Sequence, residues 1–249
     1  MRLVVEVWRQ EGPEAHGAFE AHEVEGCDPR MSVLELLDHL NEVLAGQGRS
    51  PVAFESDCRE GICGACGLTV DGRPHGWADN LPACQQRLGP RDEDARVRLE
   101  PLRSRLFPVL RDLVVDRGVL DDIVLEGGFV GLDTGLAPDA DALPVPKARA
   151  EAALDLAACI GCGACVAACP NGSAALYAGA RLAHLAMLAT SSLERARRVR
   201  ALTHVLDEEF GPCSGYGECA HVCPAGLPLG VTAQVTRERW GAAWHRART

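Results

Sequence analysis

The chain has 249 residues, enough for one large domain or two of ordinary size, and an apolar fraction of 47%, enough to fill hydrophobic cores. Its formal net charge of −10 at pH 7 argues against a nucleic-acid-binding protein, because such a protein gathers Lys and Arg to neutralise phosphates. Charged residues precede any long apolar region at the start of the chain, and no run of about 18 apolar residues occurs, so we expect no signal peptide and no transmembrane segment.

The N-terminal part of the chain predicts strands and one helix. Residues 3–9 and 17–25 predict two strands that pair as a hairpin. Residues 32–35 (Ser-Val-Leu-Glu) form a capping box, which predicts a helix that ends near Gly46 or Gly48. The helix would carry four leucines on one face: Leu36, Leu37, Leu40 and Leu44.

Farther along, residues 68–70 and 97–100 predict two more strands. Pro, Gly and Asp then accumulate, for example at Pro138-Asp139, which indicates a boundary between domains. Residues 174–190 and 192–209 have the spacing of long helices. We therefore expect an α+β protein with three parts: a mixed domain at 1–104, a linker or transition segment at 105–148, and a helical domain at 149–249.

Twelve cysteines in a chain without a predicted secretion signal are expected to be metal ligands rather than disulfides. The first group has the spacing C-x4-C-x2-C followed by a distant fourth cysteine, which is the plant-type pattern for a 2Fe–2S cluster. Glycines in this run would let the backbone approach the sulfides closely and donate hydrogen bonds to sulfur. The predicted ligands are Cys58, Cys63, Cys66 and Cys84.

A zinc site is the alternative for this first group. Structural zinc is usually held by two separated C-x2-C pairs, whereas this run has one such pair and a four-residue gap before it. The spacing therefore favours the 2Fe–2S cluster.

Two more cysteine runs lie in the helical part. Residues 159–170 follow C-x2-C-x2-C-x3-C-P, the bacterial ferredoxin pattern, in which the fourth cysteine serves the other cluster of a pair. Residues 213–224 repeat this pattern, but Tyr216 stands where the second cysteine is expected.

The crossed-ligand rule assigns these cysteines to two clusters. Four thiolates are predicted to hold a 4Fe–4S cluster: Cys159, Cys162, Cys165 and Cys223. Three are predicted to hold a 3Fe–4S cluster, because the corner iron lacks a cysteine: Cys169, Cys213 and Cys219. A 4Fe–4S cluster with one water or non-cysteine ligand is the alternative for this last site.

The remaining cysteine, Cys27, is interpreted as a small hydrophobic residue in or near a strand. No nucleophile–base pair or phosphate-binding loop is visible, so we expect no catalytic residue on this chain. The histidines show no convincing ligand spacing. The chemistry would be that of the clusters, and three clusters in one chain suggest a path for electrons between two redox partners.

The order and spacing of these runs resemble the iron–sulfur subunit of succinate dehydrogenase or fumarate reductase. The resemblance covers nearly the whole chain and includes residues 107–116 and a Cys-Pro pair after both helical-domain runs. It implies an N-terminal β-grasp domain of the plant-type ferredoxin fold, followed by an all-α ferredoxin-like domain. It also implies electron transfer from FAD, covalently held in a flavoprotein subunit, through 2Fe–2S, 4Fe–4S and 3Fe–4S.

The resemblance further implies a membrane-anchor subunit beneath the helical domain, at the cytoplasmic face of a bacterial inner membrane. Family members that bind quinone beside the 3Fe–4S cluster usually carry Trp after the first Cys-Pro and His after the first cysteine of the second run. Here these places hold residues 171–173 (Asn-Gly-Ser) and Ser214. This resembles the branch whose anchor is a single dihaem cytochrome b, so we expect electrons to leave to haem b, with menaquinone bound elsewhere; a quinone site on this chain stays unknown.

Three alternatives stay open. A fumarate reductase would run the same reaction backwards, and sequence does not determine direction because cluster potentials depend on environment. A subunit of another flavin oxidoreductase, such as a heterodisulfide or glycolate system, generally lacks the N-terminal 2Fe–2S domain. A stand-alone electron carrier would purify as a free monomer with intact clusters.

Overall fold

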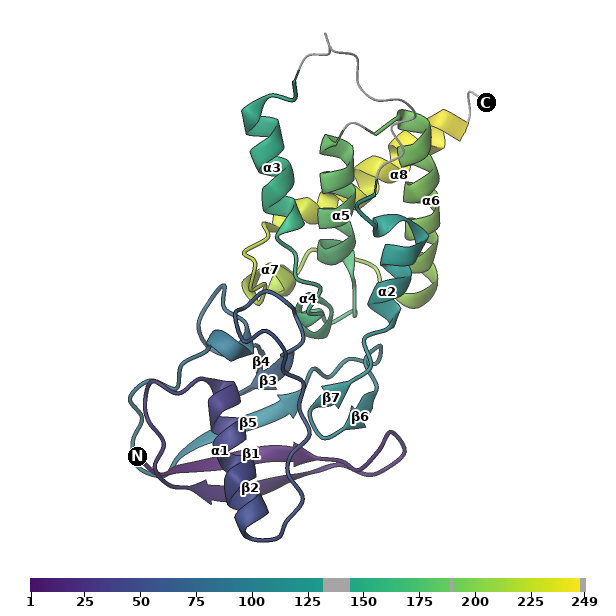
Figure 1. Cartoon of the computed structure of the whole chain (residues 1–249). Helices are drawn as coiled ribbons and strands as arrows, with labels where there is room; N and C mark the ends of the chain where they lie inside the picture. Colours follow the sequence, from purple (N-terminus) through teal and green to yellow (C-terminus); the bar gives the residue numbers. More distant parts are fainter. Residues whose placement is uncertain (132–143, 189, 247–249) are drawn as a thin grey trace. The chain divides into compact units, whose positions relative to one another are not determined.

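The computed structural model describes residues 1–131, 144–188 and 190–246 (Figure 1). The chain divides into two compact units that interleave along the sequence. The first unit comprises Met1–Arg117, Ile160–Ala168 and His221–Gly226; the second comprises Gly118–Cys159, Cys169–Ala220 and Leu227–Thr249. The domain limits expected from the sequence (1–104, 105–148 and 149–249) stay a prediction.

The first unit is built on a five-stranded sheet with the order β2-β1-β5-β3-β4. The strands are β1 (Leu3–Arg9), β2 (Ala18–Val24), β3 (Leu68–Val70), β4 (Arg73–Pro74) and β5 (Ala95–Pro101). The predicted hairpin is confirmed, because β1 pairs antiparallel with β2 from Leu3 opposite Val24 onward. Strand β5 pairs parallel to β1, and a helix crosses one face of the sheet, which is the expected β-grasp arrangement.

That helix, α1 (Val33–Gly46), begins at the predicted capping box. The Glu35 backbone N–H donates to the Ser32 hydroxyl at 3.2 Å, and the Ser32 N–H donates to the Glu35 carboxylate at 2.6 Å. This reciprocal pair satisfies two backbone donors that a helix start otherwise leaves open. The four leucines expected on one face of the helix are all buried.

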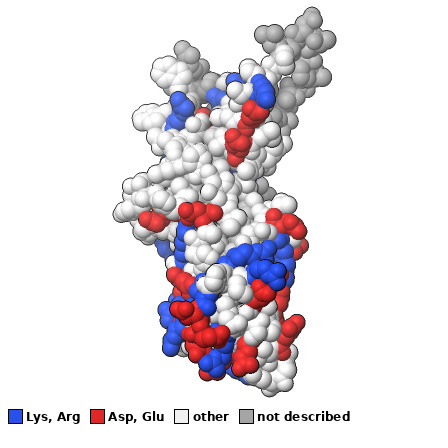
Figure 2. Space-filling model, turned by 90° about the vertical axis from the view of Figure 1, so that its left-hand side faces the viewer, with Lys and Arg blue, Asp and Glu red and all other residues white. Residues whose placement is uncertain are grey.

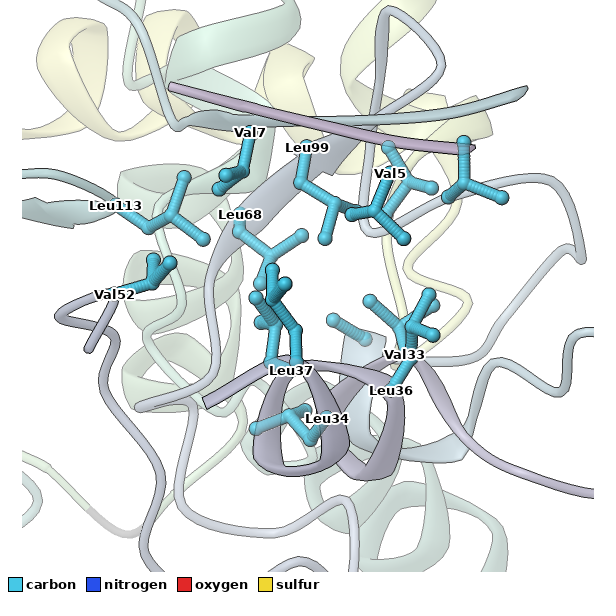
Figure 3. Close-up of a cluster of buried hydrophobic side chains, with 14 of the residues drawn as sticks. Val5, Val7, Val33, Leu34, Leu36, Leu37, Val52, Leu68, Leu99 and Leu113 are labelled. Carbon is cyan, nitrogen blue, oxygen red and sulfur yellow. The ribbon is translucent and has the colours of Figure 1, made fainter. Parts of the chain in front are cut away.

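The core of the first unit lies between α1 and the sheet (Figure 3). Alternate side chains of β1 point into it, so Val5 and Val7 are fully buried while Glu6 is not. Valines and leucines of the strands face Leu36 and Leu37 of α1. The period-two pattern of the strand and the 3.6-residue pattern of the helix thus meet in one apolar layer.

Residues 105–131 contain more regular structure than the sequence predicts. A two-stranded sheet pairs β6 (Val109–Arg111) with β7 (Val114–Val115), and α2 (Val119–Ile123) follows, continuing into a π-helical turn at Val124–Gly128. The Asp112 carboxylate ties this hairpin to its unit, because it accepts the backbone N–H groups of Gln10 and Ala53, each at 2.9 Å. The Pro138-Asp139 pair lies outside the described residues.

The second unit consists of helices. Its long helices are α3 (Lys147–Ala157), α5 (Ala175–Met187), α6 (Ser192–Glu209) and α8 (Ala233–Arg246), which confirms the two predicted from spacing. Helix α5 is the most buried of them and packs against α3 and α8, while α6 packs along α8. Short elements occur in both units: a 3₁₀ turn at Ala83–Gln85 and helix α4 (Ala164–Ala168) in the first, a 3₁₀ turn at Leu229–Thr232 in the second, and helix α7 (Glu218–His221) where the chain passes between them.

In the part of the chain that the structure describes, no helix is both long and apolar enough to cross a bilayer. Figure 2 shows how charge is distributed on one side of the molecule. On that side, acidic and basic side chains are interspersed over the sheet-bearing unit, whereas the helical unit presents mostly uncharged atoms.

The α1 core makes a stability prediction. Leu40 is fully buried, so Leu40→Ala should lower the free energy of unfolding of the first unit by about 2–5 kcal/mol through lost burial and a residual cavity. Leu110 on β6 is 44% exposed, and Leu110→Ala is the control, expected to cost about 0.5 kcal/mol or less. Urea unfolding followed by circular dichroism would measure both; equal losses would contradict the assigned core.

Candidate metal centres

The first cysteine group lies in a loop whose backbone turns inward toward sulfur. The Cys58 sulfur accepts three backbone N–H groups, from Glu60 at 3.3 Å, Ile62 at 3.4 Å and Cys63 at 3.3 Å. The Cys63 sulfur accepts the N–H of Ala65 at 3.4 Å. These donors, with the neighbouring Cys63 thiol, lower the pKa of Cys58 to about 7, because hydrogen bonds favour the charged thiolate.

The other two cysteines of this group are buried. Cys66 precedes β3, and Cys84 lies in the 3₁₀ turn at Ala83–Gln85; each is 5% exposed. Burial, together with the nearby Cys84 and Cys63 thiols, raises the pKa of Cys66 to about 12. A thiolate in such a place needs a compensating cation. The Cys58 thiol neighbours that of Cys63, and the Cys66 thiol neighbours those of Cys84 and Cys63, so the four predicted 2Fe–2S ligands lie near one another. Four thiols in one region fit an iron–sulfur cluster.

A buried histidine, which spacing alone did not single out, supports the Cys84 turn. The Ala83 N–H donates to Nδ1 of His75 at 3.2 Å, and the side chain is 1% exposed. Burial and then the charge of Arg117 lower the pKa of His75 to about 4, so the ring is neutral at pH 7. Its Nε2 has no hydrogen-bond partner among the described residues.

The second cysteine group is mostly in the first unit. Cys162 and Cys165, and also Cys223 from the later run, belong to segments of that unit, and Cys162 packs with Val222 in a small apolar cluster. Cys162 and Cys223 are each 7% exposed. Cys159 ends a segment of the second unit directly before Ile160. Three of the four predicted 4Fe–4S ligands therefore lie in the sheet-bearing unit.

The loops of the first and second groups touch through their backbones. Gly64 has a φ of +72°, and a Cβ added there would lie 2.2 Å from the carbonyl oxygen of Ile160. No side chain fits that gap, because real Cβ atoms do not approach an oxygen so closely. The glycine therefore permits both the left-handed turn and the contact.

The third cysteine group lies in the second unit. Burial, and then the charges of Cys169 and Cys213, raise the pKa of Cys219, so these three predicted 3Fe–4S ligands lie close together. They line one hollow with Tyr216, which is 62% exposed and occupies the place of the missing cysteine. In the described part of the chain, three thiols border this hollow.

Asn171, Ser173 and Ser214 stand where quinone-binding family members usually carry Trp and His, and each forms a hydrogen bond within this chain. The Asn171 amide donates to the Ser214 hydroxyl at 2.8 Å and to the Pro212 carbonyl at 2.9 Å. The Ser173 hydroxyl is buried and accepts the Ala175 N–H at 3.3 Å. A separate hollow of about 330 Å³ adjoins Cys213, with Phe210 and Arg239 in its lining.

Cys27 is 2% exposed, and its thiol donates to the Val24 carbonyl at 3.5 Å. It packs into the core beneath the sheet, which confirms its interpretation as a small hydrophobic residue.

The loop contact makes a second prediction, for which the chain offers a matched pair of glycines. Gly64 and Gly72 both have positive φ, but a Cβ at Gly72 would meet nothing within 4 Å. Gly72→Ala should cost about 1–2 kcal/mol from the left-handed backbone alone. Gly64→Ala adds the clash with Ile160, so we expect a larger loss of stability and less bound iron per chain. Thermal melts and iron analysis would measure this; equal effects of the two substitutions would contradict the contact.

Two known domain families match the chain. A 2Fe-2S iron-sulfur cluster binding domain matches residues 4–122, and a 4Fe-4S dicluster domain matches residues 155–227. The first match contains all four cysteines of the first group, and the second contains both later runs.

Whole proteins are similar as well. A succinate dehydrogenase iron-sulfur subunit of Bacillus subtilis (strain 168) is 29% identical, over 81% of this chain and 78% of that protein. The Mycobacterium smegmatis Sdh1 complex in the apo form contains a chain with the same fold, at a TM-score of 0.73 and 22% identity, covering 96% of this chain and 97% of that chain. A fumarate reductase iron-sulfur subunit of Mycobacterium tuberculosis (strain CDC 1551 / Oshkosh) is 32% identical, over 98% of this chain and 94% of that protein. With such identity over nearly the full length of both proteins, this chain belongs to the family of succinate dehydrogenase and fumarate reductase iron–sulfur subunits.

Proposed function

We propose that this chain is the electron-transfer subunit of a succinate dehydrogenase. It passes electrons from the FAD of a flavoprotein subunit through 2Fe–2S, 4Fe–4S and 3Fe–4S clusters to a membrane cytochrome b and menaquinone. The chain itself does not bind the dicarboxylate. The alternative is a fumarate reductase that runs in the reverse direction, since relatives of both names match this chain.

One observation carries the proposal: the cysteines form three groups in succession. The loop of the first group touches the loop of the second through Gly64 and Ile160. Cys165 of the second group and Cys169 of the third lie on one short run around α4. Each cluster, when bound, would take up and release one electron at a time. Thiolates placed in such a series suit a path for electrons better than a single structural metal.

The first cysteine group is accessible from outside, as electron entry requires. Ile62, directly before Cys63 in this loop, is 70% exposed, and Leu81, three residues before Cys84, is 38% exposed. Cys63 itself is exposed. An apolar tip around an accessible thiol supports docking of the flavoprotein subunit here.

The third group supports an exit toward a membrane partner. Tyr216 and Leu229 border its hollow and are 62% and 38% exposed. The Ser214 and Ser173 hydroxyls are already bonded within the chain. We therefore place the acceptor, a haem b, in an anchor subunit and the quinone elsewhere. A quinone found against Ser173 or Ser214 in a structure of the complex would overturn this assignment.

These partners would hold the chain on the cytoplasmic face of the bacterial inner membrane, where the complex would join the tricarboxylic acid cycle to respiration. Purification of the native complex tests the assembly. We expect the chain to copurify with a flavoprotein and a haem-containing membrane subunit. A monodisperse free monomer with intact clusters would instead indicate a stand-alone carrier.

The same preparation tests substrate and clusters by electron paramagnetic resonance. We expect a 3Fe–4S signal in the oxidised complex and a 2Fe–2S signal after addition of succinate. A complex with clusters that succinate does not reduce would contradict the proposed reaction.

The ligand count of the third cluster makes a further prediction. Tyr216→Cys would supply the missing thiolate at an exposed position. In a fraction of the molecules, the 3Fe–4S cluster should therefore gain an iron and become 4Fe–4S. The oxidised 3Fe–4S signal should fall and the iron content should rise. Tyr216→Ser is the matched control, because it removes the ring without adding a thiol, and it should keep the 3Fe–4S signal. An unchanged spectrum in Tyr216→Cys would count against the three-ligand assignment.

A further inference from the structure

Arg117 ends the first long segment of the sheet-bearing unit, just after β7, and its side chain lies where the first two cysteine loops meet. Its Nη1 donates to the carbonyl oxygen of Gly64 at 2.7 Å and to that of Cys162 at 3.1 Å. Its Nη2 donates to the carboxylate of Glu55 at 2.8 Å and to the carbonyl of Ala65 at 3.4 Å. One guanidinium therefore bonds to both loops.

The surroundings of Arg117 indicate a fixed position. The side chain is 18% exposed, and all its partners belong to the same compact unit. Three carbonyl oxygens converge on it from two loops, and their partial negative charges would repel one another without a cation between them. A planar guanidinium with several donors satisfies such a set, whereas an ammonium group offers only a point charge.

The partners of Arg117 are backbone atoms of the predicted ligand loops. Gly64 and Ala65 stand between Cys63 and Cys66, and Cys162 is itself a predicted 4Fe–4S ligand. Any shift of this side chain would therefore move ligand-bearing backbone of both sites. Ion pairs on exposed residues elsewhere in the unit, such as Arg96 with Glu6, have no such connection.

We propose that Arg117 is a positioning residue that locks the 2Fe–2S loop to the 4Fe–4S loop and raises the reduction potentials of both clusters. The inference rests on the ligand assignments of the proposed function. A buried positive charge beside a cluster favours its reduced, more negative state, because cluster potentials follow local charge and hydrogen bonding. Glu55 acts in the opposite sense, since its carboxylate offsets part of that charge.

Redox titration of the intact complex, monitored by paramagnetic resonance, tests the proposal. Arg117→Gln should lower the reduction potential of each cluster by about 59 mV. That shift corresponds to a roughly tenfold change in the equilibrium constant of one-electron reduction. Glu55→Gln should raise both potentials. Arg117→Lys keeps the positive charge but loses the planar guanidinium and its several donors. The potentials of both clusters should then stay near those of the wild type, while the magnetic coupling between the two reduced clusters changes.

Arg96→Gln is the matched control, because it removes one positive charge from an exposed pair and should leave both potentials unchanged. Opposite shifts in Arg117→Gln and Glu55→Gln would support the proposal, because a purely structural role would not produce them. Unchanged cluster potentials in both Arg117→Gln and Glu55→Gln, with unchanged magnetic coupling in Arg117→Lys, would overturn the proposal. If Arg117→Gln fails to load clusters, the sign of the Glu55→Gln shift decides. A wild-type complex without 2Fe–2S and 4Fe–4S signals would instead refute the proposed function.

Discussion

The backbone contact between Gly64 and Ile160 is the constraint on which the arrangement of the first two sites depends. A cluster loop must turn its N–H groups toward sulfur, as the loop around Cys58 does. Turning the N–H groups inward points carbonyls such as that of Gly64 outward. Outward carbonyls of two touching loops need donors, and Arg117 supplies them. The geometry that suits thiolate binding thus creates the demand for a cation between the loops.

The interleaving of the two units parallels the predicted use of the cysteine runs. The segment Ile160–Ala168 and the segment His221–Gly226 belong to the sheet-bearing unit, although both come from the helical half of the sequence. These segments carry predicted ligands of the second cluster, whereas Cys169, Cys213 and Cys219 stay in the helical unit. The predicted exchange of a cysteine between runs, typical of two-cluster ferredoxins, therefore coincides with a change of unit.

Features with local causes could be predicted from the sequence. The capping box at Ser32, the leucine face of α1 and the strand β1 each depend on neighbouring residues, and the structure has each of them at the predicted residues. The cysteine groups were also visible, because ligand spacing is local within a loop. Features that depend on contacts between distant parts of the chain could not be predicted in this way. The hairpin of β6 and β7 is held through its own turn residue, because the Asp112 carboxylate accepts backbone N–H groups of Gln10 and Ala53 from distant parts of the chain. The two short strands carry little pattern of their own. His75 and Arg117 owe their roles to burial beside loops that spacing does not bring together.

The first and third cysteine groups each have an exposed cysteine. Cys63 of the first group and Cys213 of the third are exposed, whereas Cys162 and Cys223 of the second are buried. Cys66 and Cys84 of the first group are as buried as these two, so solvent and partner atoms reach the first and third groups through Cys63 and Cys213. A fourth thiol in the place of Tyr216 would also lie at the surface, because Tyr216 is 62% exposed. Under the proposed function, Tyr216 determines which cluster can form there, so the proposed exit for electrons differs in chemistry from the second cluster.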